Sequence, residues 1–143
     1  MSSNRVLIKN YTEITGKRLP TYPLVEVKIW IDNEEKNVDA LVDTGYDGNL
    51  LLSKEKADEL NITDDYLIQD DPDNIQVANG EEIETYLYQS TVRLGNIQGP
   101  LSFNVVSTKN TLIWDAILGR SALYSYEVLF NEKIHPKKLI ITK

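Results

Sequence analysis

The chain contains no cysteine, which excludes disulfides, thiolate metal sites and cysteine nucleophiles. Its one histidine, His135, precedes Pro136, and this context favours a loop residue over a catalytic one. A Ser-His-Asp triad would need that histidine, and the sequence has no nucleophile elbow, no His-Glu-x-x-His zinc motif and no phosphate-binding glycine loop. We therefore expect no metal site and no cofactor.

Long apolar runs and an excess of positive charge are also missing. No run of about 18 apolar residues could span a bilayer, and the first residues lack the apolar core of a secretory signal. The formal net charge of -7 argues against binding to a phosphate backbone. Lysines near the C-terminus are interpreted as a solvated strand edge: Lys133, Lys137, Lys138 and Lys143. We expect a soluble cytoplasmic protein without nucleic-acid or membrane partners.

What the chain does have is enough apolar sequence for one core. Its 143 residues are 41% hydrophobic, which is sufficient for a single domain and too little for two ordinary ones. Tyrosines and many valines, isoleucines and leucines favour strands, and only one stretch has a convincing helical pattern. The predicted class is mainly β.

The sequence pattern of the first half of the chain predicts strands, a loop and a short helix. Apolar and polar residues alternate over residues 25–31 and 38–42, as in half-buried strands, and residues 32–36 are predicted to turn the chain. A short apolar run at 50–52 follows. Ser53 is suited to cap a short helix that continues to about Leu60.

The second half repeats this order. Residues 70–74 predict a turn, and a hairpin with arms at 75–78 and 82–90 is predicted around Asn79-Gly80. Further strands and turns are predicted at 95–96, 101–105, 115–120, 126–130 and 139–142, with one helical turn up to residue 124. Strand, hairpin, strand, glycine loop and short helix thus occur twice, which indicates a weak internal duplication.

The sequence Asp43-Thr44-Gly45 directly follows the apolar strand at 38–42 and places a carboxylate on rigid support. Two carboxylates held side by side share a proton and can polarise a water molecule between them. The corresponding loop of the second half, at Gly119, lacks an aspartate. Each chain therefore supplies one catalytic carboxylate.

These residues resemble the retropepsin-like aspartic proteases, which work as homodimers with one Asp-Thr-Gly per subunit. The resemblance covers residues 23–130 and rests on residues 41–45, on residues 117–120 and on the hairpin between them. It implies a retropepsin-like β-barrel with a short helix and half of an active site per chain. Residues 1–22 would form an N-terminal arm, and residues 131–143 a C-terminal strand in the dimer interface.

The resemblance also implies roles for the loop residues. Asp43 would activate water for endopeptidase cleavage of an extended peptide, and Thr44 would hydrogen-bond across the dimer axis. Gly45, without a Cβ, lets the backbone approach the carboxylates and the substrate. Tyr46 is larger than the residue usual in viral members and could narrow a side-chain pocket.

Further residues are assigned to support and to substrate binding. Asp47 would pair with Arg120 behind Gly119, and it could also contact the substrate main chain. The pair would be costly to break if partly buried and would matter little if exposed. Ala78, Asn79 and Gly80 would form the tip of a flap that closes over the cleft.

Other interpretations stay open. The same fold could serve as a catalytically silent dimerisation or peptide-binding domain. A monomeric small-ligand barrel could contain Asp-Thr-Gly as a simple turn. Asp115 could form a dyad with Asp43 within one chain, although we expect a structural role for it. The acidic residues of the 70–74 turn lack the spacing of a calcium loop.

Overall fold

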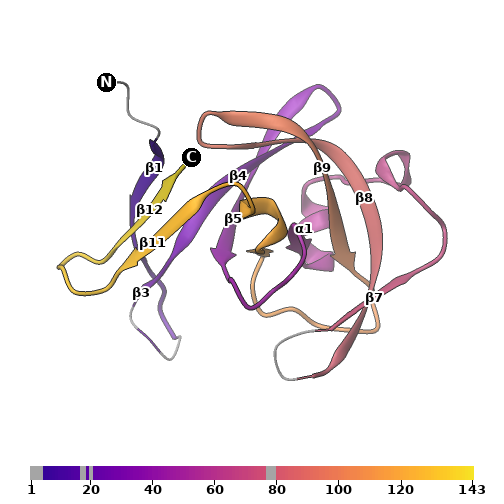
Figure 1. The fold of residues 1–143 in the computed structure, drawn as a ribbon. Helices are drawn as coiled ribbons and strands as arrows, with labels where there is room; N and C mark the ends of the chain where they lie inside the picture. The colour runs from indigo at the N-terminus through magenta and orange to yellow at the C-terminus, as the bar shows by residue number, and fades with distance from the viewer. Residues whose placement is uncertain (1–4, 17–18, 20, 77–79) are drawn as a thin grey trace.

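A computed structural model describes residues 5–16, 19, 21–76 and 80–143 of the protein, and Figure 1 shows their arrangement. The strands are β1 (Arg5–Asn10), β2 (Thr12–Glu13), β3 (Thr21–Tyr22), β4 (Leu24–Ile31), β5 (Glu34–Val42), β6 (Leu50–Leu52), β7 (Asp73–Gln76), β8 (Glu82–Leu94), β9 (Ile97–Val106), β10 (Ala116–Leu118), β11 (Glu127–Asn131) and β12 (Lys138–Thr142). The helical segments are α1 (Lys54–Glu59), η1 (Asp64–Tyr66) and η2 (Ser121–Leu123). Among the described residues, no helix is long and apolar enough to cross a bilayer.

The central sheet closes into a barrel. Its strand order is β4-β5-β10-β6-β9-β8-β7, and β4 also pairs with β8, so the six strands from β4 to β8 form a closed ring with β7 outside it. The alternating residues of β4 point into this ring and are fully buried, together with Phe103 of β9. The mainly β barrel predicted from the sequence is confirmed.

The order of the strands also shows the duplication predicted from the sequence. If β4, β5 and β6 of the first half are exchanged with β8, β9 and β10 of the second, the strand order of the ring is the same read backwards. β5 runs parallel to β10 and β6 runs parallel to β9, while β6 and β10 are antiparallel neighbours. Each half ends in a short helical segment, α1 or η2. β5 therefore corresponds to β9 and β6 to β10, so the loop after β5 corresponds to the loop after β9 and not, as the sequence predicted, to the loop at Gly119, which follows β10.

Turn chemistry sets the register of two hairpins. Asp32 and Asn33 both have positive φ, at 53° and 65°, and Ile31 pairs directly with Glu34. The predicted turn over residues 32–36 is therefore too long, because the strand resumes at Glu34. The other turn is of the predicted glycine-first kind: Gly95 has a φ of 59° and joins β8 to β9.

Helix α1 follows the prediction closely. The Ser53 hydroxyl accepts a hydrogen bond from the backbone N–H of Lys56 at 3.1 Å, Ala57 is buried, and Asn61 has a φ of 60° beyond the helix end. This cap satisfies a backbone donor that a short helix would otherwise leave without an intrahelical partner.

We expect Ser53→Ala to lower the free energy of unfolding by about 1 kcal/mol, the usual contribution of a serine N-cap. Urea denaturation measures it. Ser125→Ala, at an exposed position, is the control and should change stability by less than about 0.5 kcal/mol. Equal losses in the two variants would contradict a capping role for Ser53.

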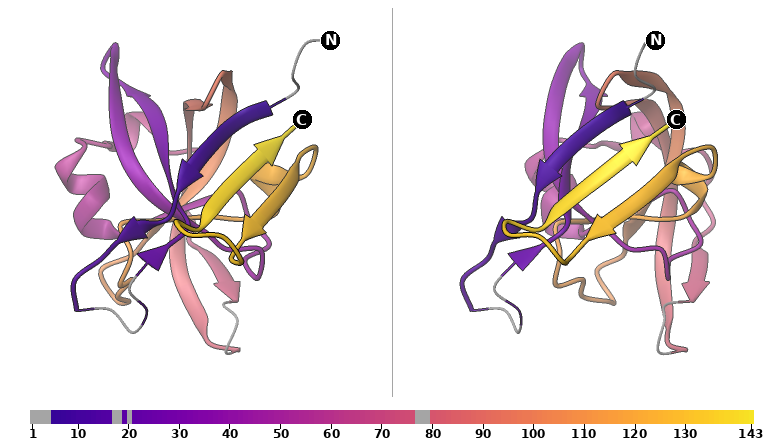
Figure 2. Two further views of the ribbon diagram at one scale, coloured as in Figure 1. Left: turned by 90° about the vertical axis from the view of Figure 1, so that its left-hand side faces the viewer. Right: turned by 60° about the vertical axis from the view of Figure 1, so that its left-hand side comes forward.

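The chain termini form a second sheet beside the barrel. β12 lies between β1 and β11 in a three-stranded sheet, which Figure 2 shows turned toward the viewer. The stretch predicted as an arm thus contains β1 and the small β2–β3 hairpin, which the sequence analysis did not predict. The predicted turn at 70–74 is also wrong in part, because Asp73 and Asn74 already belong to β7.

Candidate active site

Asp43 is the first residue after β5 and is held by backbone hydrogen bonds on both sides. Its N–H donates to the carbonyl of Leu118 in β10 at 3.0 Å, and its own carbonyl accepts from Tyr46 at 3.2 Å. The Gly45 N–H donates to carboxylate Oδ1 at 2.9 Å. The carboxylate is only partly buried. The barrel therefore presents one oriented carboxylate at its surface.

Thr44 and Gly45 are both exposed on the single chain. A Cβ added to Gly45 would lie 3.1 Å from Asp43 Oδ1, tighter than most real Cβ contacts. Glycine at this position therefore allows the backbone N–H to reach the carboxylate without crowding it.

The loop after β10 supports the Asp43 loop from behind. Gly119 N–H donates to the Asn49 carbonyl at 2.8 Å, Arg120 N–H to the Tyr46 carbonyl at 2.8 Å, and the next amide to the Gly48 carbonyl. A Cβ on Gly119 would lie 2.6 Å from Tyr46 Cδ2 and 2.7 Å from the Tyr46 carbonyl oxygen, and closer still to the Gly48 carbonyl. Only glycine fits here without displacing the Asp43 loop.

Arg120 and Asp47 form the ion pair that the sequence analysis assigned to them. Both side chains are mostly exposed, at 61% for Arg120 and 82% for Asp47. The Ser121 hydroxyl also donates to the Asp47 carbonyl. Of the two cases considered from the sequence, the exposed one applies, so the pair adds little to stability.

Arg120→Ala should therefore lower the free energy of unfolding by less than about 1 kcal/mol, because solvent screens the ion pair and the backbone hydrogen bond of residue 120 survives. Thermal or urea unfolding of the purified variant measures this. A loss of several kcal/mol in unfolding free energy would contradict this expectation and show that the guanidinium is essential to the stability of the loop.

Tyr46 is buried, with only 7% of its surface exposed, and packs over Gly48. Its hydroxyl finds no hydrogen-bond partner among the described residues. Burial raises the pKa of Tyr46 to about 12, and the negative charge of Asp73 acts in the same direction. The phenol is therefore neutral throughout the ordinary pH range.

The raised pKa of Tyr46 predicts a change of folding stability at alkaline pH. An unfolded tyrosine loses its proton near pH 10, whereas folded Tyr46 keeps it up to about pH 12, so the stability from the neutral phenol is lost as pH rises through that window. Tyr46→Phe should weaken the fall of unfolding free energy between pH 10 and pH 12, as chemical denaturation at several pH values would measure. At neutral pH the variant should be no less stable, because an unpaired buried hydroxyl is removed. Identical slopes for both proteins would contradict this account.

A cavity of about 470 Å³ opens beside the carboxylate. It is lined by Asp43, Gly45, Tyr46, Leu51, Glu81, Ile83, Thr111, Leu112, Ile113, Trp114 and Ile117. Most of these side chains are apolar, as in typical ligand pockets. The sequence analysis did not identify the part of the cavity wall from Leu112 to Trp114. The feature of the sequence that could have revealed it is a short apolar stretch within a polar loop.

The hairpin of β7 and β8 lies on one side of this cavity. Gln76 pairs with Glu82, and Ile83 of β8 reaches the cavity lining. Of the predicted flap tip, Gly80 has a φ of 86°, whereas Ala78 and Asn79 lie outside the described residues. The flap therefore stays a prediction.

Buried polar groups fix the base of the hairpin, and the sequence analysis missed them. The Thr85 hydroxyl donates to the Asp73 carbonyl at 2.6 Å. The Asn104 amide donates to the Thr85 hydroxyl at 2.9 Å and to Asp73 Oδ2 at 3.2 Å. Thr85 and Asn104 are both buried, so β7, β8 and β9 are joined at this point by satisfied polar contacts.

The aspartate considered as an intrachain partner of Asp43 does not join the site. Asp115 is exposed and does not line the cavity; its carbonyl accepts the backbone N–H of Ser53 at 3.0 Å, in keeping with the structural role expected for it. Within the described part of the chain, no group of three or more His, Cys, Asp or Glu side chains could hold a metal ion.

The comparisons with known proteins agree with this geometry. A family described as aspartyl protease matches residues 25–122, and no curated protein matches the chain. Among solved structures, the chain is similar to the EIAV protease complexed with the inhibitor HBY-793, with a TM-score of 0.54 and 21% identity over 78% of this chain and 93% of that one. At this identity the likeness concerns the fold. The family match covers more than half of the chain, from the β4 strand to the loop behind Gly119, and the chain therefore belongs to the aspartyl protease family, with a retropepsin-like fold.

Proposed function

We propose that the protein is an aspartic endopeptidase that cleaves peptide bonds with a water molecule held between two Asp43 carboxylates, one from each chain of a homodimer. The observation that carries this proposal is that the loop after β5 presents one oriented aspartate beside the cavity. In the equivalent loop after β9 the one aspartate, Asp115, is exposed and does not line the cavity, while the Gly119 loop supports the Asp43 loop through backbone hydrogen bonds. The second carboxylate then has to come from another copy of the chain.

The reaction follows from the shared proton of such a pair. The ionised carboxylate takes a proton from the water as its oxygen attacks the peptide carbonyl, and the protonated one gives its proton to the developing oxyanion. Collapse of the tetrahedral intermediate then breaks the C–N bond, with a proton passing to the leaving amine. The Gly45 N–H orients Asp43 for these steps. The proposal includes no metal or cofactor.

We place the dimer contact on the face that carries the exposed loop residues Thr44 and Gly45, and we extend it to the terminal sheet. β12 is already paired on both sides within one chain, so it would contribute through its face. Ile8 and Leu129 both stand opposite Ile140 in register, and they are 46% and 53% exposed. A row of apolar side chains on an outer sheet face supports burial there against a second copy.

The hairpin of β7 and β8 would act as the flap, with Ala78, Asn79 and Gly80 at its tip and an extended peptide beneath it. Asp47, in the same loop as Asp43 and mostly exposed, would contact substrate main chain. A cytoplasmic location stays a prediction from the sequence.

The proposal is tested by measuring peptide cleavage and molecular mass on the same sample. We expect the purified protein to cut a mixture of random peptides at mildly acidic pH and to have the mass of a dimer by light scattering. A dimer that binds peptides without cutting them would favour the silent binding domain. An active protein that is strictly monomeric would contradict the shared site.

A further inference from the structure

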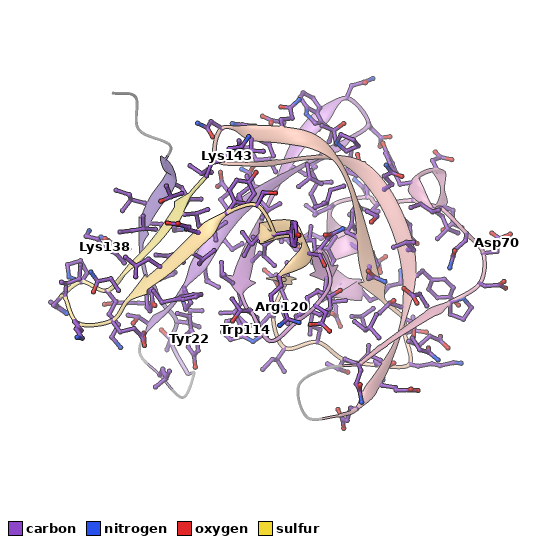
Figure 3. All side chains as sticks on the ribbon, in the orientation of Figure 1. Tyr22, Asp70, Trp114, Arg120, Lys138 and Lys143 are labelled. Atoms are coloured by element: carbon purple, nitrogen blue, oxygen red, sulfur yellow. The ribbon has the colours of Figure 1, made fainter. Side chains whose placement is uncertain are left out.

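A second cavity lies at the end of the barrel away from Asp43. It measures about 430 Å³, and the aromatic residues Trp30 and Tyr66 line it together with five polar residues. Strand β5 separates the two regions: it begins at Glu34, beside the β4–β5 turn, and its nine residues span roughly 30 Å before Asp43. In Figure 3 the labelled Trp114, from the cavity beside Asp43, lies well below the β4–β5 hairpin, whose tip is at the top of the view. We call this second cavity the Trp30 groove.

The groove is an open depression with walls that are held in place. None of the seven described residues that line it is buried, and they come from β4, the turn after it, η1, β8 and β9. The Tyr66 hydroxyl accepts the backbone N–H of Asp32 at 2.8 Å, and the Ser90 hydroxyl donates to the Trp30 carbonyl at 2.6 Å. These bonds join η1 and β8 to the β4–β5 hairpin. The groove is therefore formed in the single chain without a ligand, which lowers the cost of ordering it on binding.

Trp30 gives the groove an apolar ring and an unused donor. It lies between Ile29 and Ile31, which are both fully buried in the barrel, so its half-buried indole lies on the outer face of β4. The indole N–H has no hydrogen-bond partner among the residues that the structure describes. An indole can only donate, so this N–H can bind an acceptor on a ligand. A ring that is apolar on its faces and polar at one edge is typical of docking surfaces.

The polar residues of the lining add further donors. Asn33 and Gln98 carry side-chain amides and Thr91 carries a hydroxyl, and within the described part of the chain no hydrogen bond uses these three side chains. A ligand that presents acceptors and few donors of its own at the contact would match this set.

The rim of the groove is negatively charged. Asp32 belongs to the lining, and Asp64 and Asp65 belong to η1, which forms one wall. Among the described residues, none of these three carboxylates forms an ion pair. Arg93 of β8, two positions beyond the lining, is already bound by both carboxylate oxygens of Glu35, at 2.9 and 3.1 Å. The rim therefore favours a cationic group on the ligand.

We propose that the Trp30 groove binds a proline-rich segment of a partner protein, in polyproline II conformation and with lysine or arginine beside the prolines. In this conformation the backbone makes no internal hydrogen bonds, and proline has no N–H, so the prolines present only acceptors. Segments of this kind dock in grooves lined by aromatic side chains. The proposal goes beyond peptide cleavage, because it concerns the other end of the barrel and is tested without catalysis.

Fluorescence polarisation tests the class of ligand. The probe is a labelled peptide of ten prolines followed by two arginines. It should bind saturably and at least about tenfold more tightly than the same peptide ending in two glutamates, because the rim repels negative charge. A glycine-serine peptide of the same length that ends in two arginines should also bind at least about tenfold more weakly than the probe. Equal affinities of the two arginine peptides would indicate simple charge attraction and would overturn the proposal.

Substitutions test the residues of the groove. Trp30→Ala should weaken binding of the arginine probe about tenfold or more, as expected for an aromatic anchor. Tyr124→Ala is the matched control, because it removes a ring that is 89% exposed and outside the groove, and it should leave the affinity unchanged. An unchanged affinity in Trp30→Ala would overturn the proposal.

Asp32→Asn tests the charged rim without a loss of packing. Asparagine tolerates the φ of 53° at this position as well as aspartate does, so the turn should keep its shape. The substitution should weaken binding of the arginine probe several-fold, because one carboxylate of the rim is lost. If Trp30→Ala did not fold, an unchanged affinity in Asp32→Asn would overturn the proposal instead.

Tryptophan fluorescence, with the unlabelled probe, places the ligand on the protein. Trp30 is one of two tryptophans, so Trp114→Phe leaves its emission alone to be measured. We expect the probe to shift this emission and to leave that of Trp30→Phe unchanged. A shift seen only in Trp30→Phe would place the peptide in the cavity beside Asp43 and would contradict the proposal. A shift of the Trp30 emission by maltohexaose, with no binding of the probe, would overturn it in favour of a carbohydrate ligand.

Discussion

Asp43→Asn should lower kcat/KM by at least about 1,000-fold, because an amide cannot take the proton of the attacking water. Asparagine has the shape of aspartate and keeps an oxygen that can accept the Gly45 N–H. The variant should therefore fold and dimerise like the wild type. Steady-state cleavage of a peptide mixture, with light scattering on the same samples, measures both properties.

Asp115→Asn is the matched control for this result. It makes the same chemical change at an exposed aspartate outside the cavity, and it keeps the carbonyl that accepts from Ser53. We expect activity close to that of the wild type. If Asp115→Asn were inactive and Asp43→Asn active, the catalytic carboxylate would have been assigned to the wrong residue.

Gly119→Ala is the second change with a large expected effect. Its Cβ would lie within 3 Å of Tyr46 atoms and near the Gly48 carbonyl, so the backbone of the Asp43 loop would have to move. Such overpacking should lower the free energy of unfolding by about 3 kcal/mol. Cleavage should fall as well, because the same loop holds the carboxylate. Urea denaturation measures the stability.

Gly99→Ala is the control for added volume. A Cβ at Gly99 in β9 meets no atom of the described residues within 4 Å, so the substitution should change stability by no more than about 1 kcal/mol. If Gly119→Ala and Gly99→Ala lost similar amounts of unfolding free energy, the close packing against Tyr46 and Gly48 would not be the reason why position 119 requires glycine.

Local signals explain which elements could be predicted from the sequence. Alternating residues in β4 and β5, the Ser53 cap of α1 and the glycine turn at Gly95 depend on neighbours within a few residues, and the structure agrees with each. β1, β2 and β3 were not predicted, because two or three apolar residues are too few to define a strand. Their strand conformation depends on distant partners, such as β12 for β1.

The same distinction applies to the site. Asp43 and Gly119 were identified as candidates because each lies in a short motif, and the Asp47–Arg120 ion pair, which the structure shows, was expected from the resemblance to the family. The contacts of Asn104 with Thr85 and Asp73, and the wall formed by Trp114 against Tyr22, join segments far apart in the chain. No local pattern reveals such contacts, because they form only when segments far apart in the chain meet in the folded protein.

Mixing wild-type chains with Asp43→Asn chains tests the shared site most directly. Equal amounts are allowed to exchange subunits at constant total protein, and peptide cleavage is then measured. If each site needs both aspartates, random pairing leaves about one quarter of the wild-type activity, because only the dimers with two wild-type chains work. Half of the activity would mean that each chain works alone, and would contradict the account.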